Sequence, residues 1–239
     1  MRRWLERLRY LLLLLAAAST PALGAGAHDS DAMTYLALGD SYTIGEGVAE
    51  AGRWPLQLAR ALREEGIALE DPRVIAQTGW TTDELSSAID VAEPLGTFDF
   101  VSLLIGVNNQ YRGRSAEDYR DEFAGLLERA IGFAGGRRDR VLVLSIPDWG
   151  ATSFGERHVL EKPGRDLGRI ARELDAYNAI ASELCSARGV AFVDITPLSR
   201  EHGGEPAMLA DDGLHPSAAM YRAWMQLALP AARNALWAR

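Results

Sequence analysis

Short apolar segments alternate with longer amphipathic segments along the chain from residue 34 onward. The apolar segments predict strands at residues 34–38, 73–76, 98–105, 141–146 and 190–194. Helical spacing, capping residues and glycine stops predict helices at residues 54–65, 82–93, 115–133 and 166–188, and a last one from 216 that is interrupted near Pro230. This alternation is typical of βαβ units, which build a mostly parallel sheet with helices on both faces. No linker rich in proline, glycine or serine divides this region, so we predict one α/β domain.

The first 27 residues differ in composition from the rest of the chain. Four arginines precede an apolar run at residues 10–18, and Ala25-Gly26-Ala27 fits the small-residue pattern of a cleavage site. We interpret residues 1–27 as a cleavable signal peptide, residues 28–239 as the mature domain, and the mature protein as secreted or periplasmic without a stable membrane anchor. An uncleaved anchor or an amphipathic helix is the alternative, but a span needs about 20 apolar residues and this run is shorter.

Charge and cysteine content exclude several classes of function. The formal net charge is −8, and no concentrated basic face is visible in the sequence, so we expect no nucleic-acid partner. The spacing of cysteine and histidine matches no zinc motif. The single cysteine, Cys185, lies in an apolar helical pattern, which favours a buried structural thiol.

Polar clusters follow the predicted strands at the point where each strand ends. The clusters are Gly39-Asp40-Ser41 after the first strand, Gly79 after the second, residues 106–109 after the third, and residues 211–215 after the fifth. Function in open parallel sheets gathers just past the carboxyl ends of the strands, so all four clusters are expected to meet at one edge.

The residue types in these clusters suit nucleophilic catalysis by serine. The hydroxyl of Ser41 needs a base, and His215 is suited to that task because histidine is the usual base for a serine nucleophile. Asp212 precedes His215 by three residues and can orient its ring, although Asp211 competes for this role. The attack creates an oxyanion, for which the backbone N–H groups of Ser41 and Gly79 and the side-chain amide of Asn108 are suitable donors.

These blocks, in this order, resemble the four sequence blocks of the SGNH hydrolases, also called GDSL-like esterases or lipases. The resemblance extends from about Thr34 to the C-terminus. It implies a three-layer α/β/α, flavodoxin-like domain with a five-stranded parallel sheet. It implies Ser41, Asp212 and His215 as the catalytic residues, Ser41, Gly79 and Asn108 as the oxyanion hole, and catalysis without a metal or other cofactor. The third block departs from the usual Gly-x-Asn-Asp because Asn109 occupies its last position, and we expect this to change local hydrogen bonding.

The expected reaction is hydrolysis of a small ester through an acyl-enzyme, with short-chain acyl, aryl or carbohydrate acetyl esters as candidate substrates. Two alternatives remain at this stage. The same site could transfer the acyl group to a carbohydrate or small-alcohol acceptor, or the chain could be an exported binding module without turnover.

Further residues near the predicted strand ends have two readings. Trp80, Tyr111, Trp149 and Phe154 could line a substrate pocket or could pack loops onto the domain. Residues 150–168 are rich in glycine and charge, and we predict a mobile loop beside the substrate entrance. His158 and His202 are expected to be solvated loop residues, and His28 to lie at the new N-terminus.

Overall fold

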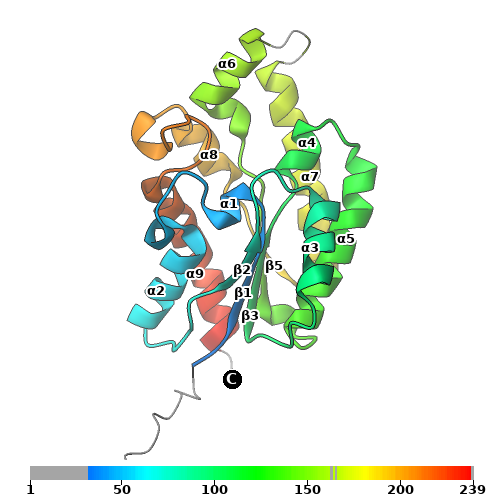
Figure 1. The fold of residues 1–239 in the computed structure, drawn as a ribbon, viewed down its shortest axis with the longest axis vertical. Helices are drawn as coiled ribbons and strands as arrows, with labels where there is room; N and C mark the ends of the chain where they lie inside the picture. Colours follow the sequence, from blue (N-terminus) through cyan, green and yellow to red (C-terminus); the bar gives the residue numbers. More distant parts are fainter. Residues whose placement is uncertain (1–31, 162–163, 165, 238–239) are drawn as a thin grey trace, which may run out of the picture. The chain divides into compact units, whose positions relative to one another are not determined.

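The computed structural model describes residues 32–161, 164 and 166–237, where five strands form one parallel sheet (Figure 1). The strands are β1 (Tyr35–Gly39), β2 (Arg73–Ala76), β3 (Phe100–Leu104), β4 (Val141–Leu144) and β5 (Ala191–Val193). Their order is β2-β1-β3-β4-β5, and every pairing is parallel. This confirms the predicted flavodoxin-like sheet. The predicted signal peptide at residues 1–27 lies outside the described residues.

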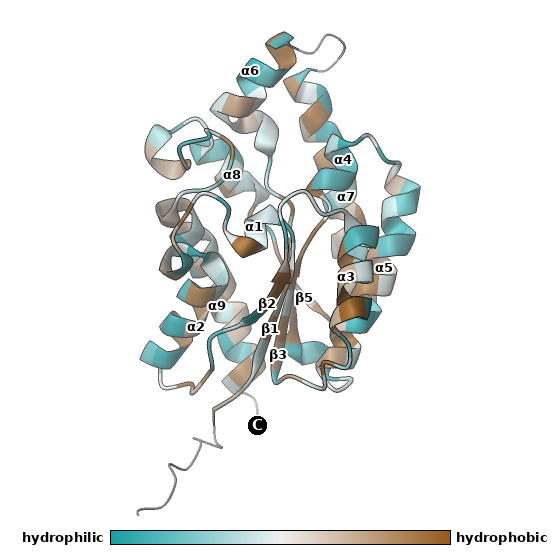
Figure 2. Cartoon of the chain, in the orientation of Figure 1, coloured by the Kyte–Doolittle hydropathy of each residue, from teal (hydrophilic) through white to brown (hydrophobic). Residues whose placement is uncertain are grey.

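The central strands are apolar along their whole length because helices cover both of their faces. Every residue of β1 and β3 is buried, as expected for strands inside a doubly covered parallel sheet. Figure 2 shows hydrophobic residues concentrated on the strands, whereas the helices mix hydrophobic and hydrophilic positions. The outer strands β2 and β5 are only partly buried, which fits their place at the edges.

The helices form two layers, one on each face of the sheet (Figure 1). One layer contains α2 (Trp54–Glu64) and α9 (Ala218–Trp237), and the other contains α3 (Thr82–Ala92), α5 (Ala116–Phe133) and α7 (Leu167–Arg188). The shorter helices are α1 (Ser41–Ile44), α4 (Val107–Tyr111), α6 (Ser153–Glu161) and α8 (Thr196–His202). In the described part of the chain, no helix is both long enough and apolar enough to span a membrane.

The capping residues that the sequence suggested determine where several helices begin and end. The side chains of Ser115 and Asp166 accept hydrogen bonds from the first turns of α5 and α7, and Thr81 forms a capping box at α3. Gly189 ends α7 in the left-handed conformation that glycine adopts without penalty.

The prediction of a loop at residues 150–168 is wrong for most of that segment. Residues Trp149–Ala151 form a 3-10 turn, and α6 follows at Ser153–Glu161. The Thr152 hydroxyl accepts a hydrogen bond from the backbone N–H of Gly155, so it caps the first turn. A threonine before this segment was the available helix signal, and the glycine content of the stretch concealed it.

The predicted interruption of the last helix at Pro230 is also wrong, because α9 continues through it. Proline removes one helical hydrogen bond and leaves the carbonyl four residues earlier without its donor. That residue, Gln226, and Pro230 itself are both exposed, so water can satisfy the carbonyl. Buried residues on either side, including Met225 and Ala232, hold both halves of α9 in the core.

Candidate active site

The segment that carries Ser41 is shaped by close contact at the carboxyl end of β1. A side-chain carbon on Gly39 would lie 2.2 Å from Thr43 Oγ1 and 2.4 Å from the Leu104 carbonyl, so only glycine fits there. Asp40 then caps α1, because its Oδ1 accepts the backbone N–H of Tyr42 at 3.0 Å. Ser41 is therefore the first residue of a short, fixed helix at the edge of the sheet.

Asp40 is a fully buried carboxyl group beside Ser41. Its Oδ2 is buried and has no hydrogen-bond partner among the described residues. Burial raises the pKa of Asp40 to about 7, although backbone N–H groups, including that of Tyr42, favour the charged form. The side chain therefore gains its charge near neutral pH, far above the ordinary range of a carboxyl group.

We expect the pKa of Asp40 to make the folded state less stable as the pH rises. The folded state binds more protons than the unfolded state between the ordinary pKa of 3.8 and about 7. The free energy of unfolding should thus fall across this window, by up to about 4 kcal/mol, and level off above it. Asp40→Asn keeps the oxygen that caps α1 but does not titrate. Urea unfolding of both proteins from pH 4 to pH 8 should show that the free energy of unfolding of the variant rises relative to that of the parent as the pH rises. A difference in this free energy that stays constant with pH would contradict the prediction.

His215 and Asp212 form a hydrogen-bonded pair in the loop before α9. His215 Nδ1 lies 2.6 Å from Asp212 Oδ2, and Asp212 Oδ1 accepts the backbone N–H groups of Leu214 at 2.8 Å and His215 at 2.9 Å. Partial burial alone would raise the pKa of Asp212, but these hydrogen bonds hold it below its ordinary value. Within the described chain, Asp212 rather than Asp211 makes these contacts. An ionised carboxylate on Nδ1 leaves Nε2 of the ring available as a base.

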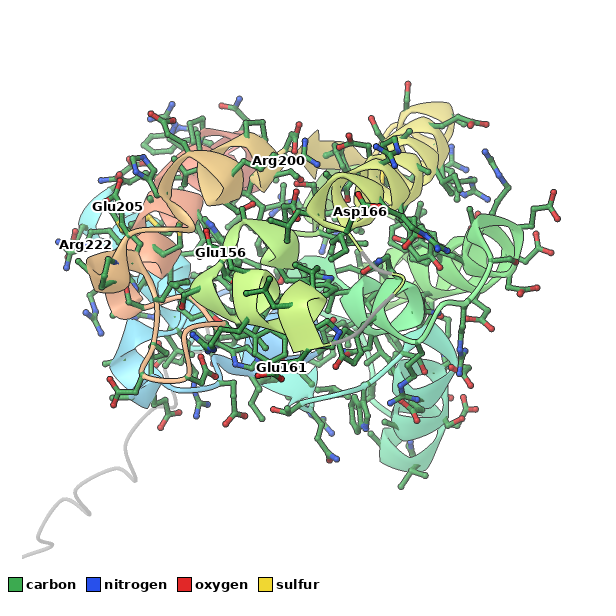
Figure 3. All side chains as sticks on the ribbon, turned by 90° about the horizontal axis from the view of Figure 1, so that it is seen from above. Glu156, Glu161, Asp166, Arg200, Glu205 and Arg222 are labelled. Carbon is green, nitrogen blue, oxygen red and sulfur yellow. The ribbon has the colours of Figure 1, made fainter. Side chains whose placement is uncertain are left out.

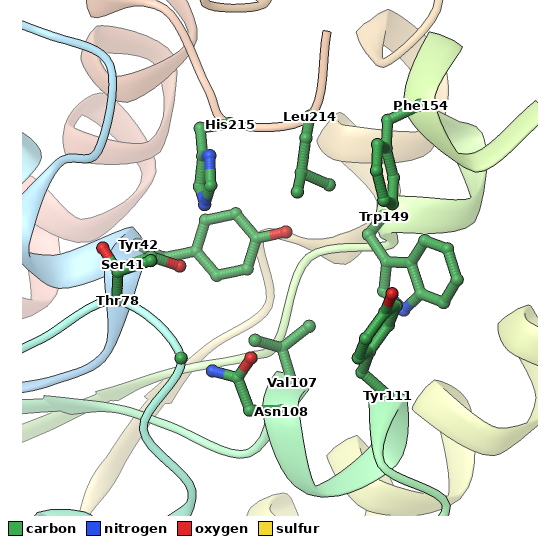
Figure 4. Close-up of a pocket in the computed structure, with 11 residues that line it drawn as sticks. Ser41, Tyr42, Thr78, Val107, Asn108, Tyr111, Trp149, Phe154, Leu214 and His215 are labelled. Carbon is green, nitrogen blue, oxygen red and sulfur yellow. The ribbon is translucent and has the colours of Figure 1, made fainter. Parts of the chain in front are cut away.

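Ser41 and His215 line the same cavity, although no direct hydrogen bond joins them in the described part of the chain. Figure 4 shows the His215 ring and the Asn108 amide on opposite sides of the cavity, with Ser41 at one end. Hydrogen bonds between a nucleophile and its base are often long in unliganded enzymes and tighten when substrate binds. The arrangement can therefore hold an ester carbonyl between the serine and the amide.

Two backbone N–H groups and one amide are placed to receive negative charge. Among the described residues, no group accepts the N–H of Ser41 or of Gly79. Asn108 donates one amide N–H to the Trp80 carbonyl at 2.9 Å, which fixes the plane of the amide and leaves its second N–H for the cavity. Donors held in place in this way are what an oxyanion requires.

Asn109, the departure from the usual third block, is fully buried in a network below this loop. Its Oδ1 accepts the backbone N–H of Thr82 at 3.0 Å. Its Nδ2 donates to the Thr82 hydroxyl at 2.6 Å and to Glu122 Oε2 at 3.1 Å. Glu122 already supplies a carboxylate here, so the amide of Asn109 can donate to it, whereas a carboxylate at position 109 would repel that of Glu122.

The variant Asn109→Asp should therefore be less stable than the parent, even though it restores the usual block. It replaces two donated hydrogen bonds with repulsion between carboxylates, which we expect to cost about 1–3 kcal/mol at pH 8. The pair would share a proton at lower pH, so the loss should shrink toward pH 5. Adding Glu122→Gln should recover stability at pH 8. Denaturant unfolding of the three proteins tests this, and an Asn109→Asp protein as stable as the parent would contradict it.

Aromatic side chains form the far wall of the cavity. The cavity has a volume of about 220 Å³, and Tyr111, Trp149 and Phe154 lie at the end away from Ser41 (Figure 4). The indole N–H of Trp149 donates to Gln110 Oε1 at 2.8 Å, which fixes the ring. Among the described residues, no carboxylate, lysine or arginine lines the cavity, and its polar side chains include the imidazole of His215 and the hydroxyls of Tyr42 and Tyr111. Glu156 and Arg200, which are labelled in Figure 3, are not among the lining residues.

The structure places the remaining candidates elsewhere. Trp80 does not line this cavity, and its backbone carbonyl instead orients Asn108. His158, predicted to be a solvated loop residue, lies on α6, and its ring packs 5.5 Å from Phe154 and 5.4 Å from Trp149, measured between centroids. His202 is the last residue of α8, where Nδ1 lies 2.8 Å from Glu205 Oε1.

Sequence reasoning missed several cavity residues because they carry no motif of their own. These are Tyr42, Thr78, Val107 and Leu214, each adjacent in sequence to a residue of the four blocks. It also missed that α6 is attached to the loop that bears His215. The backbone N–H of Phe154 donates to the Gly213 carbonyl at 2.9 Å, which places an aromatic ring of α6 beside that loop.

Comparisons with known proteins agree with this geometry. A model of the GDSL-like Lipase/Acylhydrolase family matches residues 37–223. The solved structure of TesA superposes with a TM-score of 0.65 at 18% identity, covering 85% of this chain and all of TesA. A variant of an acetyl xylan esterase from Geobacillus stearothermophilus gives a TM-score of 0.62 at 18% identity, covering 84% of this chain and 94% of the esterase. No curated protein sequence matches the chain significantly.

Proposed function

This chain belongs to the GDSL-like lipase/acylhydrolase family, whose members are hydrolases that act on esters, and we propose that it hydrolyses small uncharged esters through an acyl-enzyme on Ser41. The observation that carries the proposal is the Asp212–His215 pair, with 2.6 Å between Oδ2 and Nδ1, on the same cavity as Ser41. The same cavity is lined by Gly79, and no described residue accepts the backbone N–H of Ser41 or of Gly79.

In the proposed mechanism, His215 takes the proton of the Ser41 hydroxyl as its oxygen attacks the ester carbonyl. Asp212 stabilises the imidazolium that forms, and the N–H groups of Ser41, Gly79 and Asn108 stabilise the oxyanion. The imidazolium then protonates the leaving alcohol, and the acyl group stays on Ser41. Water attacks this acyl-enzyme with His215 again as base, which releases the acid and restores the serine.

The cavity limits the size and charge of the proposed substrate. Pockets for drug-sized ligands are about 300–1,000 Å³, and the volume here is about 220 Å³. An apolar wall without carboxylates, lysine or arginine favours uncharged groups, because an ion would lose its hydration without gaining a partner. Short acyl, aryl and carbohydrate acetyl esters fit these limits. The same site could also pass the acyl group to a carbohydrate or small alcohol instead of water.

Export is part of the proposal and is supported by the sequence of residues 1–27. The arginines, the apolar run and the Ala25-Gly26-Ala27 pattern favour cleavage after Ala27. Expression of the full chain in a bacterial host, followed by N-terminal sequencing of the exported protein, should give His28 as the first residue. Full-length protein retained with the cells would contradict this part of the proposal.

A panel of p-nitrophenyl esters of increasing acyl length tests the proposed activity. We expect turnover of the acetyl and butyryl esters and a steep decline for long chains, because the cavity is small and aromatic side chains occupy its end away from Ser41. Analysis of the products with and without an added alcohol separates hydrolysis from acyl transfer. Absence of turnover of every ester, with a protein shown to be folded, would contradict the proposal.

A further inference from the structure

Tyr42 places a phenol hydroxyl in the cavity between the reactive end and the aromatic wall. The residue is only 3% exposed, and its ring packs against His215 with centroids 5.7 Å apart and against Trp224 at 5.9 Å. Figure 4 shows its hydroxyl directed away from Ser41, toward Trp149 and Leu214. The ring is thus held on two sides and presents one polar atom to the space that a substrate would fill.

No described residue forms a hydrogen bond with this hydroxyl. The indole N–H of Trp149 on the same wall, by contrast, is already bonded to Gln110. Burial, and next the charge of Asp40, raises the pKa of the Tyr42 phenol above its ordinary value, so the group keeps its proton at neutral pH. It is therefore a neutral donor in a largely apolar cavity. A purely hydrocarbon group filling this space would remove water from the hydroxyl and leave it without a partner, which is unfavourable.

A neighbouring small cavity does not explain the hydroxyl better. That cavity has a volume of about 20 Å³, enough for one water molecule, and Tyr42 also lines it. A buried water needs two to four polar partners. The polar side chains around this cavity already bond to protein: Asp148 to Gly150 and Arg200, Thr152 to Trp149, and Ser199 to Thr196.

We propose that the Tyr42 hydroxyl donates a hydrogen bond to an oxygen of the substrate, so that the preferred esters carry an ether, keto or hydroxyl oxygen in the group that fills the aromatic end of the cavity. This inference rests on the proposed esterase function. It narrows the substrate class from small uncharged esters to oxygen-bearing ones, because a site with a buried donor discriminates against an analogue that lacks the acceptor.

Two pairs of esters that differ by one atom test the inference, one for each side of the ester bond. On the acyl side, p-nitrophenyl 3-methoxypropanoate is compared with p-nitrophenyl pentanoate. On the alcohol side, 2-methoxyethyl acetate is compared with butyl acetate. The ratio of kcat/KM within a pair is measured for the parent and for Tyr42→Phe. The intrinsic reactivity of each ester cancels when the two ratios are compared.

We expect Tyr42→Phe to lower the preference for the oxygen-bearing ester about tenfold in one pair, and that pair identifies the side of the ester that faces Tyr42. Tyr35→Phe is the matched control. Tyr35 is the first residue of β1, and its buried hydroxyl forms a hydrogen bond with Ser102. Its removal should leave the kcat/KM ratio of both ester pairs unchanged. In the parent, the ratio for the same pair should also exceed the ratio of the two esters' rates of hydroxide hydrolysis in solution, a measurement that does not depend on the variant.

If the ratio of kcat/KM within each pair is the same in the parent and in Tyr42→Phe, the inference is overturned. This includes the case in which Tyr42→Phe lowers kcat/KM equally for all four esters. Either result would leave the proposed function standing, because turnover of any ester supports it. Absence of turnover with all four esters and with p-nitrophenyl acetate would instead contradict the proposed function.

Discussion

Ser41→Ala should lower kcat for ester hydrolysis by about 10⁴-fold or more while leaving the fold intact. The variant removes one oxygen from a side chain at the edge of the cavity, and Asp40 still caps α1 through the backbone N–H of Tyr42. Residual turnover would come from the oxyanion donors and from binding alone. The measurement is kcat with p-nitrophenyl acetate, together with a thermal unfolding curve that should match that of the parent.

Ser87→Ala is the matched control for this loss. Ser87 lies on α3, and its hydroxyl donates a hydrogen bond to the Asp83 carbonyl one turn earlier. The Ser87→Ala substitution removes a hydroxyl oxygen from a serine outside the cavity, and this variant should keep the full parental kcat. An Ser41→Ala protein with more than a small percentage of parental activity, in a preparation free of parent enzyme, would show that another group performs the attack.

Asp212→Asn should lower kcat by about 10⁴-fold. An asparagine oxygen can still accept the backbone N–H groups of Leu214 and His215, so the turn should keep its shape. Its amide would then face His215 Nδ1, where two donors cannot pair, and the ring would have to adopt the other tautomer. Nε2 would then carry the proton and could no longer accept one from Ser41. The rate loss should appear in kcat far more than in KM.

Asp211→Asn distinguishes the two adjacent carboxylates: among the described residues, the carboxylate bonded to His215 Nδ1 is that of Asp212, so the Asp211→Asn protein should retain activity. Asp212 also contributes to stability, since hydrogen bonds in the folded state keep its pKa low. That contribution is present above the ordinary pKa of a carboxyl group and is lost as the pH falls through the lowered value. The Asp212→Asn protein should lack this part of the acid sensitivity. Equal losses of kcat in Asp211→Asn and Asp212→Asn would contradict the assignment of Asp212 as the partner of His215.

The fold was largely predictable because local signals and the global pattern agree. The apolar pattern of the strands is visible in short stretches of sequence, and the Ser115 and Asp166 caps and the Gly189 stop are set by interactions within a few residues; the structure confirms them. The helix through Pro230 was not predictable, because packing of distant segments outweighs the local penalty. The helix at Ser153–Glu161 was missed because the glycines of residues 150–168 suggested a loop. A side-chain carbon on Gly155 would lie 2.5 Å from the Trp149 carbonyl, so the close packing there needs glycine.

The part of the candidate site that was predictable from the sequence consists of residues whose type is required by the reaction and whose spacing along the chain is short. Asp212 and His215 lie three residues apart, so one turn determines their geometry. The partner of Asn109 was not predictable, because Glu122 reaches it from a different helix. The orientation of the Tyr42 hydroxyl and the displacement of Trp80 from the cavity wall likewise depend on how separate loops pack. The catalytic roles themselves stay predictions until they are measured.

The most direct test of the account is covalent labelling of the mature protein with a serine-directed phosphonate, followed by peptide mapping in a mass spectrometer. The account predicts one adduct per chain, located on Ser41 and absent from Ser41→Ala. Labelling should also be strongly slowed in Asp212→Asn, because the nucleophile then lacks its base. An adduct on a different residue, or a folded parent protein that is not labelled while it hydrolyses esters, would contradict an acyl-enzyme on Ser41.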